Sequence, residues 1–335
     1  MAGSHVGISR RRMIALTTST LVAAKAAPAA FAQDATPSGA WSFTDDKGVT
    51  VTLDAMPERL LIDVNAAAPL WDFGIRPVAV FGWNIYGEDD FGDAGGNIDP
   101  STVEIAGSST EPAQLEKMAT TQPDLIITLT WLPDVPDDYW SIDPEILPLV
   151  QEIAPLLAMS ATGNADVNTR RFAELAEALG ADLSTPELAE AEEQYNAAIE
   201  ALETTAAEKA DLSVLFLYVD SEELYIASPP DWADLVFYQE AGVPIVEPEA
   251  EPGTFWEQLS MEQIMKYPAD VIMSSTRPGT LTPEEIAEHP VLGLHPAAAA
   301  GQIYPWNQDF IQSYQGMTEA LTLLTESLEA AEKIL

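Results

Sequence analysis

Two residues with strong binding chemistry occupy equivalent places in a repeated pattern. Trp131 follows Asp124 by seven residues, and Arg277 follows Asp270 by seven. A tryptophan offers an aromatic face for stacking, and an arginine offers a planar, charged fork of hydrogen-bond donors. If they face each other, they would suit a flat, partly anionic small molecule. The alternatives are core or lobe-interface packing for Trp131 and a surface ion pair of Arg277 with Asp270 or a nearby glutamate.

The repeated pattern itself predicts two halves of similar design. Leu115–Thr130 reads LEKMATTQPDLIITLT, and Met261–Thr276 reads MEQIMKYPADVIMSST. In each copy a glutamate, Glu116 or Glu262, precedes the aspartate by eight residues, and an apolar run follows the aspartate. Each copy predicts a short amphipathic helix that ends near a proline, followed by a buried strand. Two α/β halves with a binding cleft between them are the simplest account.

A rule for open parallel sheets extends the set of candidate binding residues. In such sheets, ligands bind beyond the carboxyl ends of the strands. In the first half, the rule selects Asn65, Trp83, Tyr86 and Trp131. In the second half, it selects Tyr218, Ser228, Trp232, Arg277, Trp306 and Tyr314. Core or lobe-interface packing is the alternative for Trp306. Trp71 and Trp256 lie in apolar helical patterns and are predicted to be core residues.

The chain lacks the residues and motifs of most catalytic and metal sites. It has no cysteine and only three histidines, His5, His289 and His295. This excludes disulfides, iron–sulfur clusters and thiolate nucleophiles, and it makes a zinc or manganese cluster a poor fit. Gly-x-Ser-x-Gly, His-Glu-x-x-His and P-loop motifs are absent. We therefore expect no catalytic residue, resident metal or cofactor. A carboxylate-dependent exported hydrolase remains a rival, and a structural or adhesive surface protein is a third reading.

Alternating strand and helix patterns predict the fold class and the domain boundaries. Both halves read as Rossmann-like α/β lobes with central parallel sheets. A helix capped by Ser184 or Thr185 and running to about Lys209 would span roughly 30–35 Å and could join the lobes stiffly. The predicted parts are a flexible leader (33–41), an N-terminal lobe (42–166), an inter-lobe helical segment (167–209) and a C-terminal lobe (210–335).

Four local elements complete the prediction. Trp41–Leu53 alternates in hydrophobicity and predicts a hairpin. Ile245–Val246 is expected to be a short strand. Trp306–Gly316 is expected to be a loop, and Met317–Leu335 a closing amphipathic helix.

The charge and the N-terminus restrict where the protein works. The net charge is −40, with 14 basic and 54 acidic residues, so a nucleic-acid partner is not expected. Residues 1–32 read as an export signal of twin-arginine type. Arg10–Arg12 precede the apolar run Ile14–Ala24, and a small-residue cleavage site follows at Ala30–Ala32. A membrane anchor is disfavoured because the apolar run is short and ends before Lys25. We expect a periplasmic or extracytoplasmic protein.

The order of these motifs resembles a known family. "P-E-R-L-L" stands at Pro57–Leu61, "G-I-R-P-V" at Gly74–Val78, and the two repeat copies follow on either side of the long helix. This resembles the periplasmic substrate-binding proteins of ABC importers for ferric siderophores, haem and cobalamin. The resemblance covers about residues 42–335 and implies two lobes joined by one rigid helix.

The resemblance also implies a function and a partner. Such a receptor captures a metal chelate between its lobes and delivers it to an ABC permease dimer, and we expect it to be a monomer. In that family a glutamate on each lobe docks into the permease, and Glu116 and Glu262 match those positions. The alternative is that both are ordinary helix N-terminal acids. Family members from single-membrane bacteria usually carry a lipidated cysteine, which this chain lacks, so an outer membrane or an uncleaved signal would have to retain it.

The scarcity of basic residues favours one class of ligand. A tricatecholate carries high negative charge and would need several basic side chains. We therefore expect an Fe(III) chelate of low charge, such as a hydroxamate siderophore. Haem needs a Tyr or His axial ligand. Because Tyr86, Tyr218 and Tyr314 could serve, haem stays open, and so does cobalamin.

Overall fold

The computed structural model describes residues 39–335. The predicted export signal, and most of the predicted leader, therefore lie outside the described residues. Trp41 already belongs to a strand, and its indole Nε1 donates to the Ala178 carbonyl at 2.7 Å. Within the described range, none of the helices has the length and apolar character needed to cross a membrane.

A small hairpin opens the N-terminal lobe, as predicted. Strands β1 (Trp41–Thr44) and β2 (Thr50–Leu53) pair antiparallel. Asp45 holds the turn, because its Oδ1 accepts from the Lys47 and Val49 amides at 3.0 and 2.8 Å. Its Oδ2 accepts from the Ala158 amide at 3.1 Å, which ties the hairpin to the main sheet of the lobe.

The main sheet of the N-terminal lobe is entirely parallel. Its strand order is β5-β4-β3-β6-β7. The strands are β3 (Leu60–Asp63), β4 (Ala79–Phe81), β5 (Glu104–Ile105), β6 (Leu125–Thr130) and β7 (Leu156–Ser160). Continuous burial of β3, β4 and β6 is typical of parallel strands covered on both faces. The helices are α1 (Val64–Asp72), α2 (Leu115–Thr120), α3 (Leu147–Ile153) and α4 (Ala165–Ala178), with the 3₁₀ turns η1 (Asp93–Gly95) and η2 (Pro100–Thr102).

The sheet of the C-terminal lobe has the expected parallel centre, β8-β11-β12, and an antiparallel edge that the sequence did not predict. Its order is β10-β9-β8-β11-β12, with β9 and β10 antiparallel to their neighbours. The strands are β8 (Val214–Val219), β9 (Leu224–Ala227), β10 (Trp256–Leu259), β11 (Val271–Ser275) and β12 (Ile303–Trp306). The helices are α6 (Ala233–Glu240), α7 (Pro283–Glu288) and α8 (Pro296–Ala299), with η3 (Pro229–Asp231), η4 (Met261–Lys266) and η5 (Leu292–Leu294).

Two local predictions in this lobe were wrong. Ile245 forms only an isolated bridge to Val214, because no second residue of the segment continues the ladder. Trp256 lies on strand β10 and not in a helix.

A tight turn after β8 creates the antiparallel arrangement: Asp220 Oδ1 accepts from the Glu222 and Glu223 amides at 2.8 and 2.9 Å. The turn sends β9 back alongside β8.

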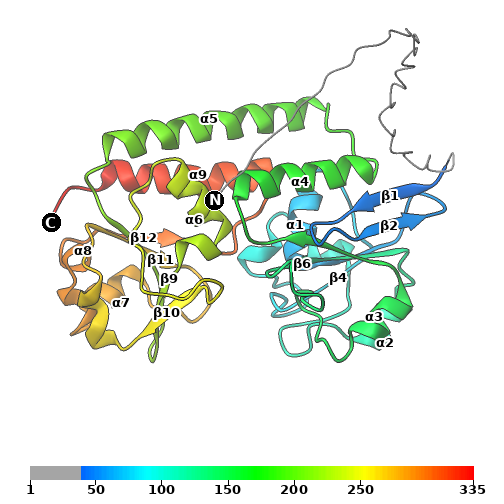
Figure 1. Ribbon diagram of the computed structural model, residues 1–335, viewed down its shortest axis with the longest axis horizontal. Coiled ribbons are helices and arrows are strands. Elements are labelled where there is room, and N and C mark those ends of the chain that lie inside the picture. Colours follow the sequence, from blue (N-terminus) through cyan, green and yellow to red (C-terminus); the bar gives the residue numbers. More distant parts are fainter. Residues whose placement is uncertain (1–38) are drawn as a thin grey trace, which may run out of the picture. The chain divides into compact units, whose positions relative to one another are not determined.

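A long helix bridges the lobes, which confirms the predicted architecture. Helix α5 (Pro186–Glu208) begins at Thr185, whose Oγ1 accepts from the Leu188 amide at 3.3 Å. Its buried stripe includes Tyr195 and Leu202. Figure 1 shows α5 running above both lobes and lying alongside α9 (Tyr314–Ala330). Helix α9 starts earlier than predicted, because Ser313 caps it by accepting from the Gly316 amide at 3.1 Å, and the helix ends at Ala330.

The repeated aspartates anchor the start of each lobe. Asp124 Oδ2 accepts from the Glu58 and Arg59 amides, both at 3.0 Å, just before β3. Asp270 Oδ2 accepts from the Ser213 amide at 2.8 Å, just before β8. Each aspartate therefore fixes the entry to the first strand of its sheet. The repeat has a structural cause in both lobes.

Candidate ligand-binding site

A pocket between the lobes brings together three of the predicted binding residues. We call it the arginine pocket, and it has a volume of about 480 Å³. The loop after β4 supplies one wall, and the C-terminal lobe supplies the rest. Its lining residues are Tyr86, Tyr218, Glu223, Tyr225, Trp256, Arg277 and Pro278. This size and this aromatic lining are typical of small-molecule sites.

Arg277 stands just beyond β11 and is held by an acid. Its Nε donates to Asp309 Oδ2 at 2.8 Å, and its Nη2 donates to Asp309 Oδ1 at 2.6 Å. Burial lowers the pKa of Arg277, but hydrogen bonding and the charge of Asp309 raise it above its ordinary value. Next to it, Thr276 Oγ1 donates to Asp93 Oδ2 at 3.0 Å, which links the two lobes at the edge of the pocket.

Aromatic rings form the opposite part of the arginine pocket. Trp256 packs against Tyr225 and Tyr218, with ring centroids 6.1 and 6.3 Å apart. The Tyr218 hydroxyl donates to Asp220 at 3.2 Å, and the Tyr225 hydroxyl donates to Glu223 at 2.8 Å. Burial and then the charge of Asp220 raise the pKa of Tyr218. The pocket therefore presents neutral phenols beside one guanidinium.

Tyr86 is the contribution of the N-terminal lobe to this pocket. Its side chain is 45% exposed, so a ligand could cover much of its ring. Burial raises the pKa of Tyr86, and the negative charge of Asp309 raises it further. The hydroxyl therefore remains protonated at neutral pH and can donate to a ligand oxygen.

Trp131 lies in a different place from Arg277. Its ring packs edge-on against Trp232 at 5.7 Å, Phe255 at 5.4 Å and Trp140 at 5.6 Å. These four rings form an aromatic seam between the lobes. One small cavity beside the seam holds about 30 Å³ and is lined in part by Asn65 and Asp309. Another, of about 300 Å³, is lined in part by Trp131 and Phe255 but does not include Arg277. The two residues at equivalent repeat positions therefore do not face each other across one cavity.

The other predicted residues of the C-terminal lobe are buried in packing. Trp306 Nε1 donates to Asp234 Oδ2 at 2.7 Å, and Trp232 Nε1 donates to the Phe255 carbonyl at 2.9 Å. Tyr314 lies in the first turn of α9 and stacks on Tyr195 at 5.7 Å. Ser228 is also buried, at the end of β9. None of these four side chains lines the arginine pocket.

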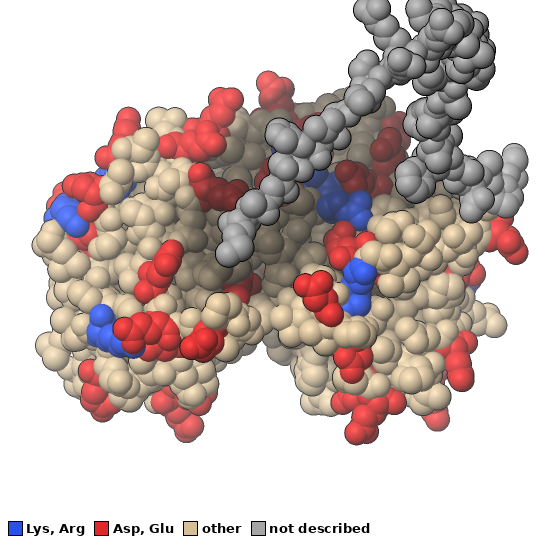
Figure 2. Space-filling model, viewed as in Figure 1, with Lys and Arg blue, Asp and Glu red and all other residues tan. Residues whose placement is uncertain are grey.

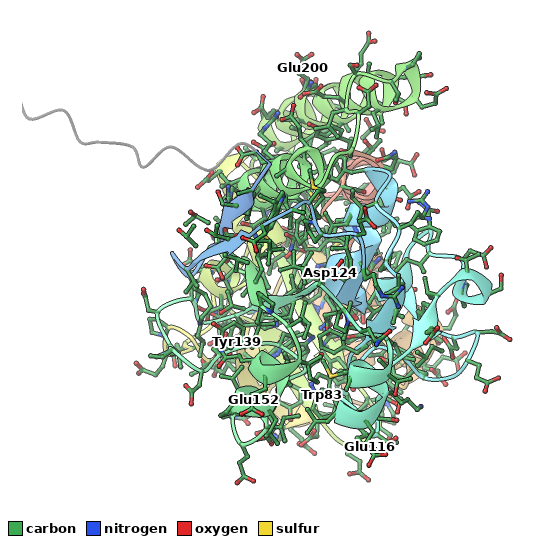
Figure 3. The ribbon with its side chains drawn as sticks, turned by 90° about the vertical axis from the view of Figure 1, so that its right-hand side faces the viewer. Trp83, Glu116, Asp124, Tyr139, Glu152 and Glu200 are labelled. Atoms are coloured by element: carbon green, nitrogen blue, oxygen red, sulfur yellow. The ribbon has the colours of Figure 1, made fainter. Side chains whose placement is uncertain are left out.

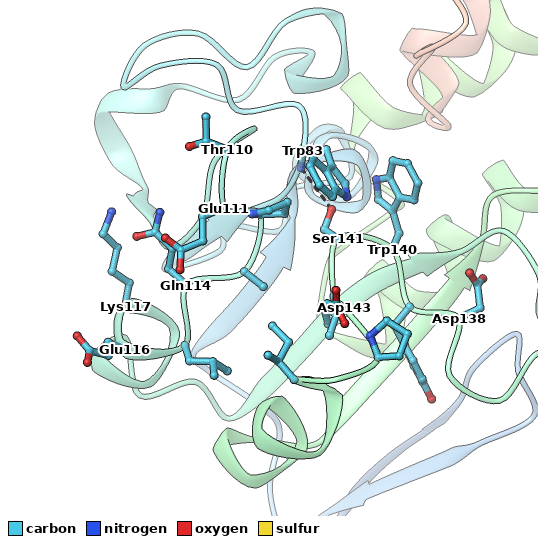
Figure 4. A pocket seen from close by; sticks show the side chains of 17 residues that line it. Trp83, Thr110, Glu111, Gln114, Glu116, Lys117, Asp138, Trp140, Ser141 and Asp143 are labelled. Carbon is cyan, nitrogen blue, oxygen red and sulfur yellow. Dashed lines mark hydrogen bonds between the residues drawn. The ribbon is translucent and has the colours of Figure 1, made fainter.

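Trp83 lines a separate groove within the N-terminal lobe. This groove has a volume of about 880 Å³ and also includes Tyr139, Trp140 and Ser141. Trp83 is 46% exposed, and its amide donates to Ser141 Oγ at 3.3 Å. Figure 4 shows Trp83, Ser141 and Trp140 on one side of the groove and Glu116 on the other. Trp83 and Tyr86, although near in sequence, therefore line different cavities.

The two predicted docking glutamates begin short helices on different lobes. Glu116 lies in the first turn of α2, and Glu262 lies in the first turn of η4. Both are exposed, and neither forms an ion pair with another residue in 39–335. In the side view of Figure 3, Glu116 lies at the end of the molecule opposite Glu200 of α5.

Two buried aspartates occupy similar places in the two lobes. Asp63 caps α1 by accepting from the Asn65 amide at 3.0 Å, and Asp234 lies in the first turn of α6. Burial raises the pKa of each to about 7. Among residues 39–335, no group of three or more His, Cys, Asp or Glu side chains could hold a metal ion.

The sequence pattern missed four residues that matter in the arginine pocket. These are Glu223, Tyr225 and Trp256, which line it, and Asp309, which pairs with Arg277. The short apolar and aromatic run Leu224–Ala227 was a sequence signal for β9. Asp309 gave no local signal, because its partner lies far away in the sequence.

Comparison with known proteins places the chain among binding proteins. A family model described as "Periplasmic binding protein" matches residues 116–310. Among solved structures, the chain is similar to DesE, a ferric-siderophore receptor protein from Streptomyces coelicolor, with a TM-score of 0.81 and 32% identity. That match covers 88% of this chain and 100% of DesE. A comparison with proteins of curated function finds no match.

More distant structures share the fold. The catecholate-siderophore binding protein VctP from Vibrio cholerae matches with a TM-score of 0.60 and 17% identity, over 87% of this chain and 99% of that chain. The Fe3+–Desferal-bound siderophore binding protein FhuD from Vibrio cholerae matches with a TM-score of 0.57 and 16% identity, over 81% and 98%. At these identities, the likeness concerns the fold alone.

Proposed function

Because the chain belongs to the periplasmic binding protein family, we propose that it is an extracytoplasmic receptor that binds a ferric siderophore and delivers it to an ABC permease. Proteins of this family are binding receptors and not enzymes, which removes the exported hydrolase as a rival. DesE, which is 32% identical, is a ferric-siderophore receptor.

The arginine pocket is the observation that carries this proposal. It lies between the lobes, since Tyr86 comes from one lobe and Arg277 from the other. Tyrosine hydroxyls and a guanidinium donate hydrogen bonds to the oxygen atoms that surround iron in a chelate, and Trp256 offers a face for its organic frame. A ligand in this pocket would therefore contact both lobes.

The charge of the protein favours a chelate of low charge. Figure 2 shows Asp and Glu side chains spread over both lobes on the face in view, with few Lys and Arg among them. Among residues 39–335, Arg277 is the only Lys or Arg that lines the arginine pocket, and it is paired with Asp309. A ferric hydroxamate, whose ligand charges balance those of iron, meets less repulsion here than a ferric catecholate. We therefore propose a hydroxamate-type siderophore.

Haem is the second candidate, because three tyrosines line the pocket. Tyr86, Tyr218 and Tyr225 could each approach a haem iron. Axial ligation by tyrosine needs the phenolate, however, and the pKa of each of these hydroxyls is raised, through burial at Tyr86 and Tyr218 and through hydrogen bonding to Glu223 at Tyr225. The surroundings of these three tyrosines therefore favour protonated hydroxyls that donate hydrogen bonds to a chelate over phenolates that coordinate a haem iron.

Quenching of tryptophan fluorescence tests the ligand. Purified protein is titrated with a ferric trihydroxamate, a ferric tricatecholate, haem and cobalamin. We expect the trihydroxamate to quench with the highest affinity, largely through Trp256, so Trp256→Phe should lose most of the signal. Trp41→Phe, in the distant hairpin, should keep it. Flat titrations with all four ligands would contradict the proposal.

We also propose that Glu116 and Glu262 dock the two lobes onto the permease. Both are exposed at the first turn of a short helix, one in each lobe. Two equivalent acids suit the related subunits of a permease dimer.

The N-terminal Arg10–Arg12 supports export by the twin-arginine route. Replacing Arg11 and Arg12 together with lysine should then leave the protein in the cytoplasm, and unchanged export would contradict that route.

A further inference from the structure

Asp309 controls the charge that the arginine pocket presents. Both of its carboxylate oxygens accept from Arg277, at 2.6 and 2.8 Å. The Asp309 side chain is 9% exposed, whereas that of Arg277 is 32% exposed. Asp309 lines the small cavity beside the aromatic seam, whereas Arg277 lines the arginine pocket. The acid therefore lies behind the arginine as seen from the pocket.

A second residue also accepts a hydrogen bond from the guanidinium of Arg277. When the Gln308 amide is oriented so that its nitrogen faces Ser275 Oγ, its oxygen accepts from Arg277 Nη1 at 2.6 Å. Three of the five guanidinium N–H groups are then used within the protein. Arg277 is fixed in place before any ligand arrives, and it keeps only part of its donor capacity for the ligand.

The remaining charges around the pocket are negative. Glu223 lines it and accepts from Tyr225 and from Gln258 Nε2, at 2.8 and 3.1 Å. Asp220 lies next to it and accepts from the Tyr218 hydroxyl. Within the part of the chain that the structure describes, no second Lys or Arg lines the pocket. The electrostatic potential in the pocket is therefore negative, although an arginine forms part of its wall.

We propose that Asp309 is a specificity-determining residue: by neutralising Arg277 it makes the site select neutral or cationic ferric chelates and reject anionic ones. The proposal rests on the function proposed above. An anionic chelate is rejected because it would give up bound water near the negative charges of Glu223 and Asp309. In return it would find no unpaired cation in the pocket. Arg277 still donates hydrogen bonds to the ligand, but it contributes no net charge.

The variant Asp309→Asn tests this directly. It keeps the shape and one acceptor for Arg277 and removes the negative charge. Affinities are measured for three chelates: a ferric trihydroxamate with a protonated amine, a neutral ferric trihydroxamate and a ferric tricatecholate. We expect affinity for the tricatecholate, relative to the neutral chelate, to rise about tenfold or more, and the gain to shrink at high salt.

Two further variants separate the possible outcomes. Glu200→Gln on α5 removes the same charge far from the pocket and should leave the affinity ratio unchanged; an equal rise there would contradict a role specific to Asp309. The double variant Arg277→Gln/Asp309→Asn removes the pair without changing the net charge. Its ratio should match that of the wild type, even if every affinity falls. A large drop of the tricatecholate ratio in the double variant would show that Arg277 acts as a free cation.

The double variant also decides the matter if Asp309→Asn alone fails to fold, as judged by circular dichroism. Failure of the proposed function looks different from failure of this inference. If the wild type binds none of the three chelates, the function proposed above is wrong. If the wild type binds and Asp309→Asn leaves the ratio unchanged, Asp309 does not determine specificity.

Discussion

Trp131 packs edge to face against Trp232, with ring centroids 5.7 Å apart, and so joins the two lobes by an apolar contact. Phe255 packs against both rings, at 5.4 and 5.9 Å. Aromatic pairs of this geometry contribute beyond the area that they bury. The aromatic seam therefore holds the lobes together next to the arginine pocket.

Replacing Trp131 with alanine should weaken this seam. We expect the free energy of unfolding to fall by about 2–3 kcal/mol, somewhat below the cost at a fully buried site. Urea denaturation measures the change. Trp83→Ala is the matched control, because Trp83 is 46% exposed and should cost much less. Equal losses for the two variants would show that the seam contributes no special stability.

Replacing Arg277 with alanine should affect both binding and stability. Chelate affinity should fall at least about tenfold, because a charge-assisted donor is lost. The free energy of unfolding should fall by about 3 kcal/mol, since Asp309 is left nearly buried without a partner. Titration and urea denaturation measure the two effects. Arg76→Ala, which removes an exposed arginine stacked on Trp71, should leave chelate affinity unchanged. Unaltered binding in Arg277→Ala would remove Arg277 from the site.

Local patterns were enough to predict the parts of the fold that are long or fully buried. The apolar runs of β6 and β11 and the capped stripe of α5 depend on neighbours in the sequence. Strands β9 and β10 are short, and Trp256 at the start of β10 is only partly buried. Pairing across the sheet, and not a local pattern, determines their structure. They were therefore missed.

The binding site was predicted less well, because side-chain direction depends on contacts across the fold. Trp131 and Arg277 hold equivalent repeat positions. Trp131, however, packs against Phe255 in the aromatic seam, whereas Arg277 pairs with Asp309 at the wall of the arginine pocket. The acid that pairs with Arg277 is 32 residues further along the chain. Spacing alone could identify Arg277, but it could not identify Asp309.

Glu116→Ala with Glu262→Ala should separate binding from delivery. Both side chains lie outside the arginine pocket, so chelate affinity should match that of the wild type. Uptake of the iron chelate by cells, or stimulation of the permease ATPase, should be lost. A matched control replaces two exposed glutamates of α5, Glu187 and Glu200, and should keep uptake. Loss of chelate binding in the Glu116/Glu262 variant would contradict the docking role.

Asp234 should make stability depend on pH. Burial raises its pKa to about 7, from 3.8 for an ordinary aspartate. Between about pH 4 and 7, the unfolded chain therefore binds fewer protons at this residue than the folded protein, and the contribution of Asp234 to stability falls as the pH rises. Above the folded pKa, the loss is complete, because the buried carboxylate is then charged.

Asp234→Asn cannot ionise, and its amide oxygen can still accept from Trp306 Nε1. At pH 4 its melting temperature should lie close to that of the wild type. By pH 8 the variant should gain about 3–6 °C relative to the wild type, since it avoids the buried charge. Calorimetry at several pH values measures the difference, with Glu200→Gln as the exposed control. If the melting curves of variant and wild type shift in parallel across this range, Asp234 does not titrate in the folded protein as its burial implies.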